Sequence, residues 1–345
     1  MSDIITSTLA KLVARQDLST HEIETVTSHI LRGDASDVEI AGFIVALRTK
    51  GETVEELSAL VRTMLGFSIP VSVAPGAVDT CGTGGDRSGT INISTIGAIV
   101  AAGAGVRVVK HGNRAASSQC GSADVLESLG IPIELGPDAV ARCVDEVGIG
   151  FCFAPRYHPA LRFIGPVRRA LGVPTTFNFL GPLANPARVL RQCVGVSDPA
   201  MAQRVANVLV ANGAEHVMVF CGGDGLDELT TTTTSHVIEY RDGVTSQYEL
   251  DATTLGIARV DLTALQGGDA RLNAEVIEQV LGGAPGPARD IAVLNAAAAV
   301  QVGGIAATWD DGVAIAKRSI DSGAASKTFD SWRTLGRSLE DKEIE

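Results

Sequence analysis

Apolar residues recur at helical spacing through the first 70 residues, as at Leu57, Leu60, Val61 and Leu65, which indicates helices with one buried face. Expected helix starts are marked by three capping boxes, each a hydroxyl residue followed three positions later by a glutamate: Ser19 with Glu22, Ser36 with Glu39, and Thr53 with Glu56. Gly33, Gly51 and Gly66 stand where these helices should stop. The pattern predicts a small N-terminal helical domain, residues 1–70, whose apolar face needs a partner.

The pattern changes near Pro70, where short apolar runs begin to alternate with Gly-rich loops and helical stretches. Expected strands include residues 77–78, 106–109 and 217–220, and a hairpin is expected over 236–250 around Asp242 and Gly243. From about residue 270 the chain is Ala-rich and helical. This order predicts a larger α/β domain, residues 71–345, with a mostly parallel central sheet. Part of 160–190 is expected to pack with the helical domain.

Composition and charge exclude several classes of protein. With 345 residues, 45% of them hydrophobic, the chain can bury a sizeable core, and its net charge of −12 argues against a nucleic-acid-binding surface. No apolar run is long enough for a membrane span, and the N-terminus lacks the pattern of a secretory signal. Six scattered cysteines form no CxxC pair, which fits a reducing cytoplasm. Residues 79–124 are slightly basic within this acidic chain, which suits an anionic small molecule.

The loop after the first expected strand, DTCGTGGDRSGTINIST at 79–95, has the composition of an anion pocket. Its glycines, Gly82, Gly84 and Gly85, allow the backbone N–H groups to approach a ligand closely. Ser94 and Thr95 lie where the next helix begins, and a helix N-terminus attracts anions. The spacing fits neither a GxGxxG fingerprint nor a Walker loop. The alternative is a Gly-rich turn with an ordinary helix cap.

Three further segments carry charges that could serve a phosphorylated substrate. Lys110 and Arg114, in a polar loop after the second expected strand, can pair with phosphate. Asp227 and Glu228, after another strand, place two carboxylates where Mg²⁺ could bind with substrate phosphates and water. Arg168, in an Arg-rich stretch, could hold a carboxylate. The alternatives are a solvated loop, a surface acidic pair and a helix-surface charge.

Several strings occur together in the order typical of one family. They are DTCGTGGD at 79–86, NIST at 92–95, KHGNRAASS at 110–118, GSADVLESLG at 121–130, FNFLGPLANPA at 177–187 and LDELT at 226–230. In them the chain resembles the anthranilate phosphoribosyltransferases of tryptophan biosynthesis, and the match covers nearly the whole chain. The resemblance implies a homodimer joined through the helical domain. It also implies transfer of the 5-phosphoribosyl group of phosphoribosyl pyrophosphate (PRPP) to the amine of anthranilate, giving N-(5-phosphoribosyl)anthranilate and pyrophosphate, the second step from chorismate.

The resemblance also implies the residues of the site. PRPP would be bound by Gly82, Gly85, Asp86, Thr90, Asn92, Ile93, Ser94, Thr95, Lys110, His111, Gly112, Asn113, Arg114, Ala115, Ala116, Ser117, Ser118 and Ser122. Anthranilate would contact Gly82, Asn113 and Arg168, with Arg168 facing its carboxylate. Ser94, Asp227 and Glu228 would hold Mg²⁺, two ions per monomer. No acid or base is assigned, because the anthranilate amine is already a neutral nucleophile.

Departures from the family pattern concern Leu161, Ala116, Cys120 and the threonines at 231–234, and none removes a residue with a charge-based role.

Two alternative functions are a pyrimidine nucleoside phosphorylase and a non-catalytic nucleic-acid-binding paralogue. A pyrimidine nucleoside phosphorylase would carry a Lys-His-Ser loop where this chain has Lys110, His111 and Gly112. A non-catalytic nucleic-acid-binding paralogue would need a basic groove, which the net charge opposes.

Overall fold

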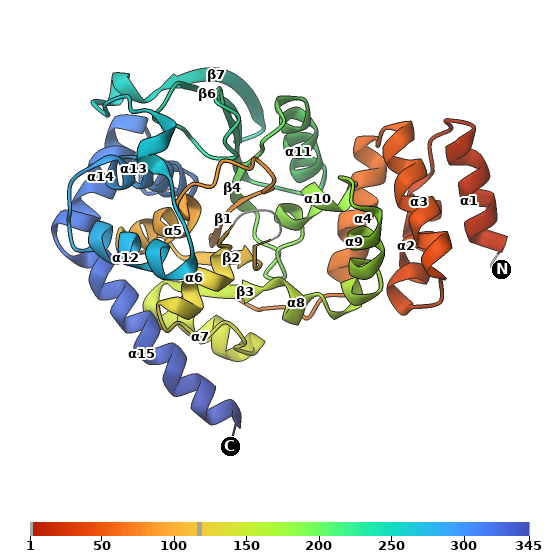
Figure 1. The fold of residues 1–345 in the computed structure, drawn as a ribbon, viewed down its shortest axis with the longest axis horizontal. Helices are drawn as coiled ribbons and strands as arrows, with labels where there is room; N and C mark the ends of the chain where they lie inside the picture. Colours follow the sequence, from red (N-terminus) through yellow and green to blue (C-terminus); the bar gives the residue numbers. More distant parts are fainter. Residues whose placement is uncertain (1–2, 116–118, 345) are drawn as a thin grey trace.

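The computed structural model describes residues 3–115 and 119–344, and its N-terminal part is a bundle of four helices (Figure 1). These are α1 (Asp3–Val13), α2 (Thr20–Arg32), α3 (Asp37–Lys50) and α4 (Val54–Gly66). All three predicted capping boxes are formed, with Ser19, Ser36 and Thr53 as the N-cap residues. The caps satisfy backbone N–H groups that a helix start leaves free, so these local signals are confirmed.

The larger part is built on one seven-stranded sheet with the order β3-β2-β1-β4-β5-β6-β7. Its strands are β1 (Val78–Gly82), β2 (Val108–Gly112), β3 (Ile149–Phe153), β4 (Arg191–Gly195), β5 (His216–Gly222), β6 (Thr234–Arg241) and β7 (Val244–Asp251). The first five strands run parallel, and β6 and β7 form an antiparallel hairpin at one edge. Asp242 and Gly243 make its turn, both with positive φ. A mostly parallel sheet with a hairpin at these residues is what the sequence predicts.

Three strands extend further than the sequence indicates. β1 continues to Gly82, β2 continues through Lys110, His111 and Gly112, and β5 continues through Cys221 and Gly222. The extension of β2 carries polar side chains because Lys110 Nζ and His111 Nδ1 find hydrogen-bond partners within the protein, so their polarity does not end the strand. These residues therefore lie on the rigid sheet and not in a loop.

Helices cover both faces of the sheet. The remaining α-helices are α5 (Ile93–Gly103), α6 (Ser122–Ser128), α7 (Pro137–Val147), α8 (Ala154–Tyr157), α9 (Gly165–Leu171), α10 (Phe177–Leu180), α11 (Pro199–Ala211), α12 (Ala270–Leu281), α13 (Pro287–Val302), α14 (Trp309–Asp321) and α15 (Ala324–Ile344). Short 3₁₀ turns are η1 (Pro159–Phe163), η2 (Gly181–Leu183), η3 (Ala252–Leu255) and η4 (Leu262–Leu265). None of the described helices combines the length and the apolar character needed to cross a membrane.

Two hydrophobic cores meet at the sheet, and β5 shows how. Val217, Val219 and Cys221 face the core shared with the helical bundle, whereas Met218 and Phe220 face the core of α5 and α13. This alternation is the period of two that a strand imposes on its side chains. The first core also contains Val167 of α9 and residues of α10, so segments from 160–190 pack against α1–α4. In Figure 1, α9 and α10 lie between the bundle and the sheet.

Candidate active site

Residues from separate strands, loops and a helix start meet at the carboxyl ends of β1, β2 and β5. The backbone N–H of Gly84 donates to Oδ2 of Asp227 over 2.7 Å, and the N–H of Ser94 donates to Oε1 of Glu228 over 3.1 Å. Lys110 Nζ donates to Oγ of Ser94 over 3.1 Å and to the carbonyl oxygen of Thr80. The sequence placed these residues after three different strands, and the parallel sheet brings them to one edge.

Burial and repulsion from nearby carboxylates oppose ionisation of the two acidic side chains at this edge, Asp227 and Glu228. Asp227 is 9% exposed, and burial raises its pKa, as does repulsion from Asp86. Burial also raises the pKa of Glu228, together with repulsion from Asp227, while the ammonium of Lys110 acts in the opposite direction. A divalent cation would remove this repulsion, and carboxylate and hydroxyl oxygens are suitable ligands for Mg²⁺. Asp227, Glu228 and Ser94 therefore fit a magnesium ion.

The described residues contain no group of three or more His, Cys, Asp or Glu side chains that could hold a metal by themselves. Mg²⁺ usually binds through one or two carboxylates and completes its coordination with water and substrate phosphates. The acidic pair is thus better suited to a metal shared with a phosphorylated substrate than to a structural metal.

Two glycines allow Asp227 to approach the ends of the neighbouring strands. A Cβ atom at Gly82 would lie 2.2 Å from Oδ2 of Asp227, and a Cβ atom at Gly195 would lie 1.7 Å from its backbone oxygen. Gly82 was predicted as a site residue on its loop position. Gly195, the last residue of β4, was not identified, because its need for glycine arises from a contact with a segment 32 residues away that no local pattern shows.

The N-terminus of α5, which the sequence predicted as an anion pocket, is occupied by contacts within the protein. Asn92 is the N-cap position of α5, but its side chain makes no cap hydrogen bond. Its amide instead donates to the carbonyl oxygen of Cys120 over 3.1 Å, and its Oδ1 accepts from Asn273 over 2.9 Å. Asn92 therefore ties together three segments around the site, and Glu228 accepts from the first turn of α5 where an anionic ligand was expected.

A buried polar network underlies the end of β2. Asp79 accepts from the backbone N–H of His111 over 3.0 Å and from Nδ2 of Asn185 over 2.8 Å. The His111 ring lies 5.2 Å from that of His158 between centroids, and burial, with repulsion from His158, lowers the pKa of His111 to about 3. His111 is therefore neutral. Its backbone, held by Asp79, fixes where the loop after β2 begins, and the sequence indicated neither Asp79 nor Asn185 for this role.

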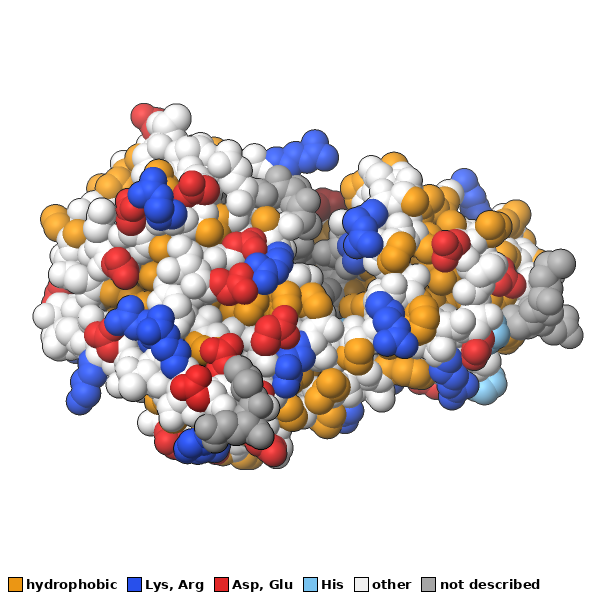
Figure 2. All heavy atoms as spheres, turned by 60° about the horizontal axis from the view of Figure 1, so that its bottom comes forward, with side chains coloured by type: hydrophobic (Ala, Val, Ile, Leu, Met, Phe, Trp, Pro, Cys, Tyr) orange, Lys and Arg blue, Asp and Glu red, His pale blue; other side chains and the backbone are white. Residues whose placement is uncertain are grey.

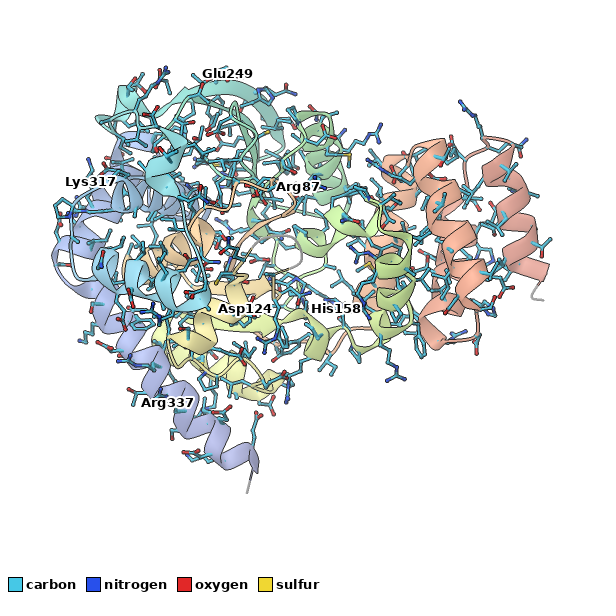
Figure 3. The ribbon with its side chains drawn as sticks, in the orientation of Figure 1. Arg87, Asp124, His158, Glu249, Lys317 and Arg337 are labelled. Atoms are coloured by element: carbon cyan, nitrogen blue, oxygen red, sulfur yellow. The ribbon has the colours of Figure 1, made fainter. Side chains whose placement is uncertain are left out.

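The loop after β2 is fastened to the start of α6. Oδ1 of Asn113 accepts from the N–H of Arg114 over 2.7 Å, and its carbonyl oxygen accepts from Oγ of Ser122 over 3.3 Å. The guanidinium of Arg114 pairs with Asp124 over 3.0 Å and with Glu127 over 2.5 Å (Asp124 is labelled in Figure 3). Arg114 is thus engaged by carboxylates in this structure. The predicted residues Ala116, Ser117 and Ser118 lie outside the described residues.

Other predicted residues lie on the first loop, in the first turn of α5 and on α9. Asp86 accepts from Oγ of Ser88 over 2.7 Å, which in turn lies 3.3 Å from Oγ1 of Thr90. Ile93 and Thr95 are buried in the first turn of α5, whereas Gly85 has a positive φ and open space around it. Arg168 is half-buried on α9, burial lowers its pKa, and no carboxylate within the described chain forms an ion pair with it. The molecular surface is hollowed between the helical bundle and the larger α/β part (Figure 2).

Comparison with known proteins assigns both parts of the chain to one family. Residues 6–68 match the helical bundle domain of the glycosyl transferase family, and residues 74–326 match its a/b domain. The anthranilate phosphoribosyltransferase of Rhodococcus jostii (strain RHA1) is 50% identical over 339 residues, covering 96% of this chain and 93% of the relative. The chain belongs to the anthranilate phosphoribosyltransferase family. The anthranilate phosphoribosyltransferase of Nocardioides sp. (strain ATCC BAA-499 / JS614) is 52% identical over 329 residues, covering 94% of this chain and 96% of the relative.

Solved anthranilate phosphoribosyltransferases share the whole fold. The enzyme from Thermus thermophilus is 38% identical, with a TM-score of 0.90, and the alignment covers 96% of this chain and 99% of that one. The Saccharomyces cerevisiae enzyme in complex with PRPP and Mg is 25% identical, with a TM-score of 0.89 over 98% and 99% of the two chains. The predicted fold class, a small helical domain with a larger α/β domain, is therefore confirmed, as is the predicted family.

Proposed function

We propose that this chain transfers the 5-phosphoribosyl group of PRPP to the amine of anthranilate at the carboxyl ends of β1, β2 and β5. The observation that carries the proposal is the meeting of Asp227, Glu228, Ser94 and Lys110 at one edge of the sheet. Membership of the family supports the reaction, and the complex of the yeast relative with PRPP and Mg supports the two ligands.

Charge separation is the main obstacle in this reaction. When the bond between ribose C1 and pyrophosphate breaks, negative charge grows on the pyrophosphate and positive charge grows on the sugar. Lys110 is held by Ser94 and Thr80 before the substrate arrives, so its ammonium group needs no reorganisation to oppose the negative charge. Backbone N–H groups of the Gly-rich loop after β1 act in the same direction.

The acidic pair and Ser94 are proposed to hold Mg²⁺, two ions per monomer. Bound Mg²⁺ supplies electrostatic stabilisation of the pyrophosphate charge. Asp227 contributes because Gly84 orients its Oδ2, and Glu228 contributes because Ser94 orients its Oε1. Each carboxylate thus accepts from a backbone N–H group, which favours a constant geometry.

The predicted substrate residues divide between two sides of the site. On the PRPP side we propose the residues of the two loops after β1 and β2 named above, from Gly82 to Thr95 and from Lys110 to Ser122. On the acceptor side we propose Gly82, Asn113 and Arg168. Arg168 has no carboxylate partner within the described chain, so its guanidinium is available to an acceptor carboxylate, with which it can form a bidentate pair. A phosphate bound to Arg114 would share its guanidinium with Asp124 and Glu127 or displace them.

The same proposal covers assembly and location. The helical domain, residues 1–70, carries two valines that are largely exposed, Val13 at 78% and Val38 at 81%, and such apolar surface suits a homodimer contact. All six cysteines are buried and no two of them form a CxxC pair, which fits a cytoplasmic enzyme.

The reaction is tested by giving the purified protein PRPP, Mg²⁺ and anthranilate, and in parallel thymidine or uridine with phosphate. We expect loss of anthranilate fluorescence with release of pyrophosphate, and no free pyrimidine base. Phosphorolysis of the nucleosides without consumption of anthranilate would overturn the proposal in favour of a nucleoside phosphorylase. Retention on nucleic acid at low salt without either reaction would favour the non-catalytic paralogue.

A further inference from the structure

Glu52 is a fully buried carboxylate in the short connection between α3 and α4, and no step of the proposed reaction uses it. Its side chain is 0% exposed, and it is contacted by residues from three separate segments. Burying a carboxylate costs desolvation free energy, and removing one of its partners destabilises the fold. Such a network is therefore expected to have a specific structural role.

The three partners of Glu52 come from different parts of the molecule. Arg48 of α3 contributes Nη1 at 3.3 Å, and Arg204 of α11 contributes Nη1 at 3.5 Å, both to Oε2. The hydroxyl of Thr176, which is itself fully buried, donates to Oε1 over 2.5 Å. Glu52 therefore connects the helical bundle, a helix that packs on the sheet, and the segment that leads into α10.

The segment fixed by Thr176 joins the two sides of the proposed site. It follows α9, which carries Arg168 and packs against α3, and it continues through α10 into η2. The carbonyl oxygen of Gly181, the first residue of η2, lies 3.1 Å from Nδ1 of His111 at the end of β2. Residues 172–183 thus run from the acceptor side to the PRPP side, and Glu52 holds them near the middle.

Arg48 adds a second attachment to the same segment. Its guanidinium lies 5.6 Å from the centroid of the Phe179 ring in α10, a distance at which a cation and an aromatic ring attract each other. The same guanidinium lies 4.0 Å from Sδ of Met201 in α11. Loss of the Glu52 carboxylate would release this side chain as well as the Thr176 hydroxyl.

We infer that Glu52, acting through Thr176, is a positioning residue that sets the place of Arg168 relative to the PRPP loops. The inference rests on the proposed role of Arg168 in binding the acceptor carboxylate. A displaced α9–α10 segment would weaken binding of anthranilate more than binding of PRPP, because the PRPP loops have further attachments outside this segment, to Asp227, Asp79 and Asp124. A residue that only stabilised the fold would affect both substrates alike.

The chain offers a matched control for this inference. Glu56, four residues further on, is also 0% exposed, but its partners, Lys50 at 2.8 Å and the N–H of Leu18 at 2.9 Å, all lie in the helical bundle. Glu56→Gln should therefore lower stability, as Glu52→Gln does, without changing the KM for anthranilate. Thr176→Val removes only the hydroxyl, and Thr176→Ser restores it.

The experiment measures KM for each substrate in the full-length protein, together with the melting temperature. We expect Glu52→Gln and Thr176→Val to raise KM for anthranilate by about tenfold while KM for PRPP changes by less than about twofold, and Thr176→Ser to restore the wild-type value. Combined with Arg168→Gln, the effect of Thr176→Val should be less than additive, because both changes act on the same contact. Equal changes for both substrates, or a pattern matching Glu56→Gln, would overturn the inference. A normal KM for anthranilate in Arg168→Gln alone would instead refute the proposed acceptor site.

Discussion

Replacing Gly195 by alanine tests whether the position of Asp227 depends on a close approach between β4 and the loop after β5. The added Cβ atom would lie 1.7 Å from the backbone oxygen of Asp227 and 2.4 Å from its carbonyl carbon. Since real Cβ contacts stay beyond 3.0 Å, the Asp227 backbone would have to retreat by at least about 1.3 Å. The obstructing atoms belong to the main chain, so a side-chain rotation cannot relieve the contact.

The displacement has a consequence for activity that can be estimated. A misplacement of about 1 Å in a catalytic arrangement can cost roughly 100-fold in rate. We therefore expect Gly195→Ala to lower kcat/KM by about 100-fold, equivalent to about 2.7 kcal/mol of transition-state stabilisation, and to cost about 1–3 kcal/mol of folding stability through overpacking. The activity loss should be accompanied by a higher Mg²⁺ requirement, because Asp227 and Glu228 move together.

The assay follows anthranilate fluorescence over a series of Mg²⁺ concentrations, with thermal unfolding measured in parallel. Gly66→Ala is the control, because a Cβ atom there would meet nothing within 4 Å and the position lies at the end of α4. That variant should keep wild-type activity. If Gly195→Ala showed wild-type Mg²⁺ dependence and an unchanged melting temperature, the contact described between β4 and Asp227 would be wrong.

Three further changes test other parts of the site. Arg168→Gln should raise KM for anthranilate by roughly 10- to 100-fold, which is the loss expected for a charge-assisted hydrogen bond. Arg169→Gln, at the exposed neighbouring residue, should leave this KM unchanged. Equal effects of the two substitutions would refute the acceptor role of Arg168. Lys110→Met should lower kcat by roughly 100- to 1,000-fold with little change in KM for anthranilate, and a normal kcat would refute a role in stabilising the leaving group. Asp227→Asn should raise the melting temperature in EDTA at pH 8, because burial raises the pKa of Asp227 in the folded state and its charge destabilises the fold above the unfolded pKa of about 3.9. The gain should shrink as pH falls towards about 4, where the wild-type carboxyl is protonated when folded, and a gain that did not vary with pH would contradict the assigned cause.

Features that depend on neighbouring residues were predictable from the sequence. The capping boxes at Ser19, Ser36 and Thr53 are formed, and the hairpin turns at Asp242 and Gly243. The loops after β1, β2 and β5 were also indicated, because each follows an apolar run and the edge of a parallel sheet gathers them.

Features that depend on contacts between distant segments were not predictable. Asp79 is an acid inside a buried strand, and its partner Asn185 lies 106 residues away. The close approach at Gly195 and the clustering around Glu52 likewise involve segments that only the folded chain brings together. The pairing of Arg114 with Asp124 and Glu127 of α6 is a further contact that the sequence did not indicate.

The acidic pair after β5 is proposed to make transfer dependent on Mg²⁺. The most direct measurement is the rate of anthranilate consumption with PRPP, with and without Mg²⁺, in the wild-type protein and in the Asp227→Ala, Glu228→Ala double variant. We expect metal-dependent loss of anthranilate fluorescence in the wild type and none in the folded double variant. Wild-type turnover in the double variant at the same Mg²⁺ concentration would contradict the metal assignment and the mechanism built on it.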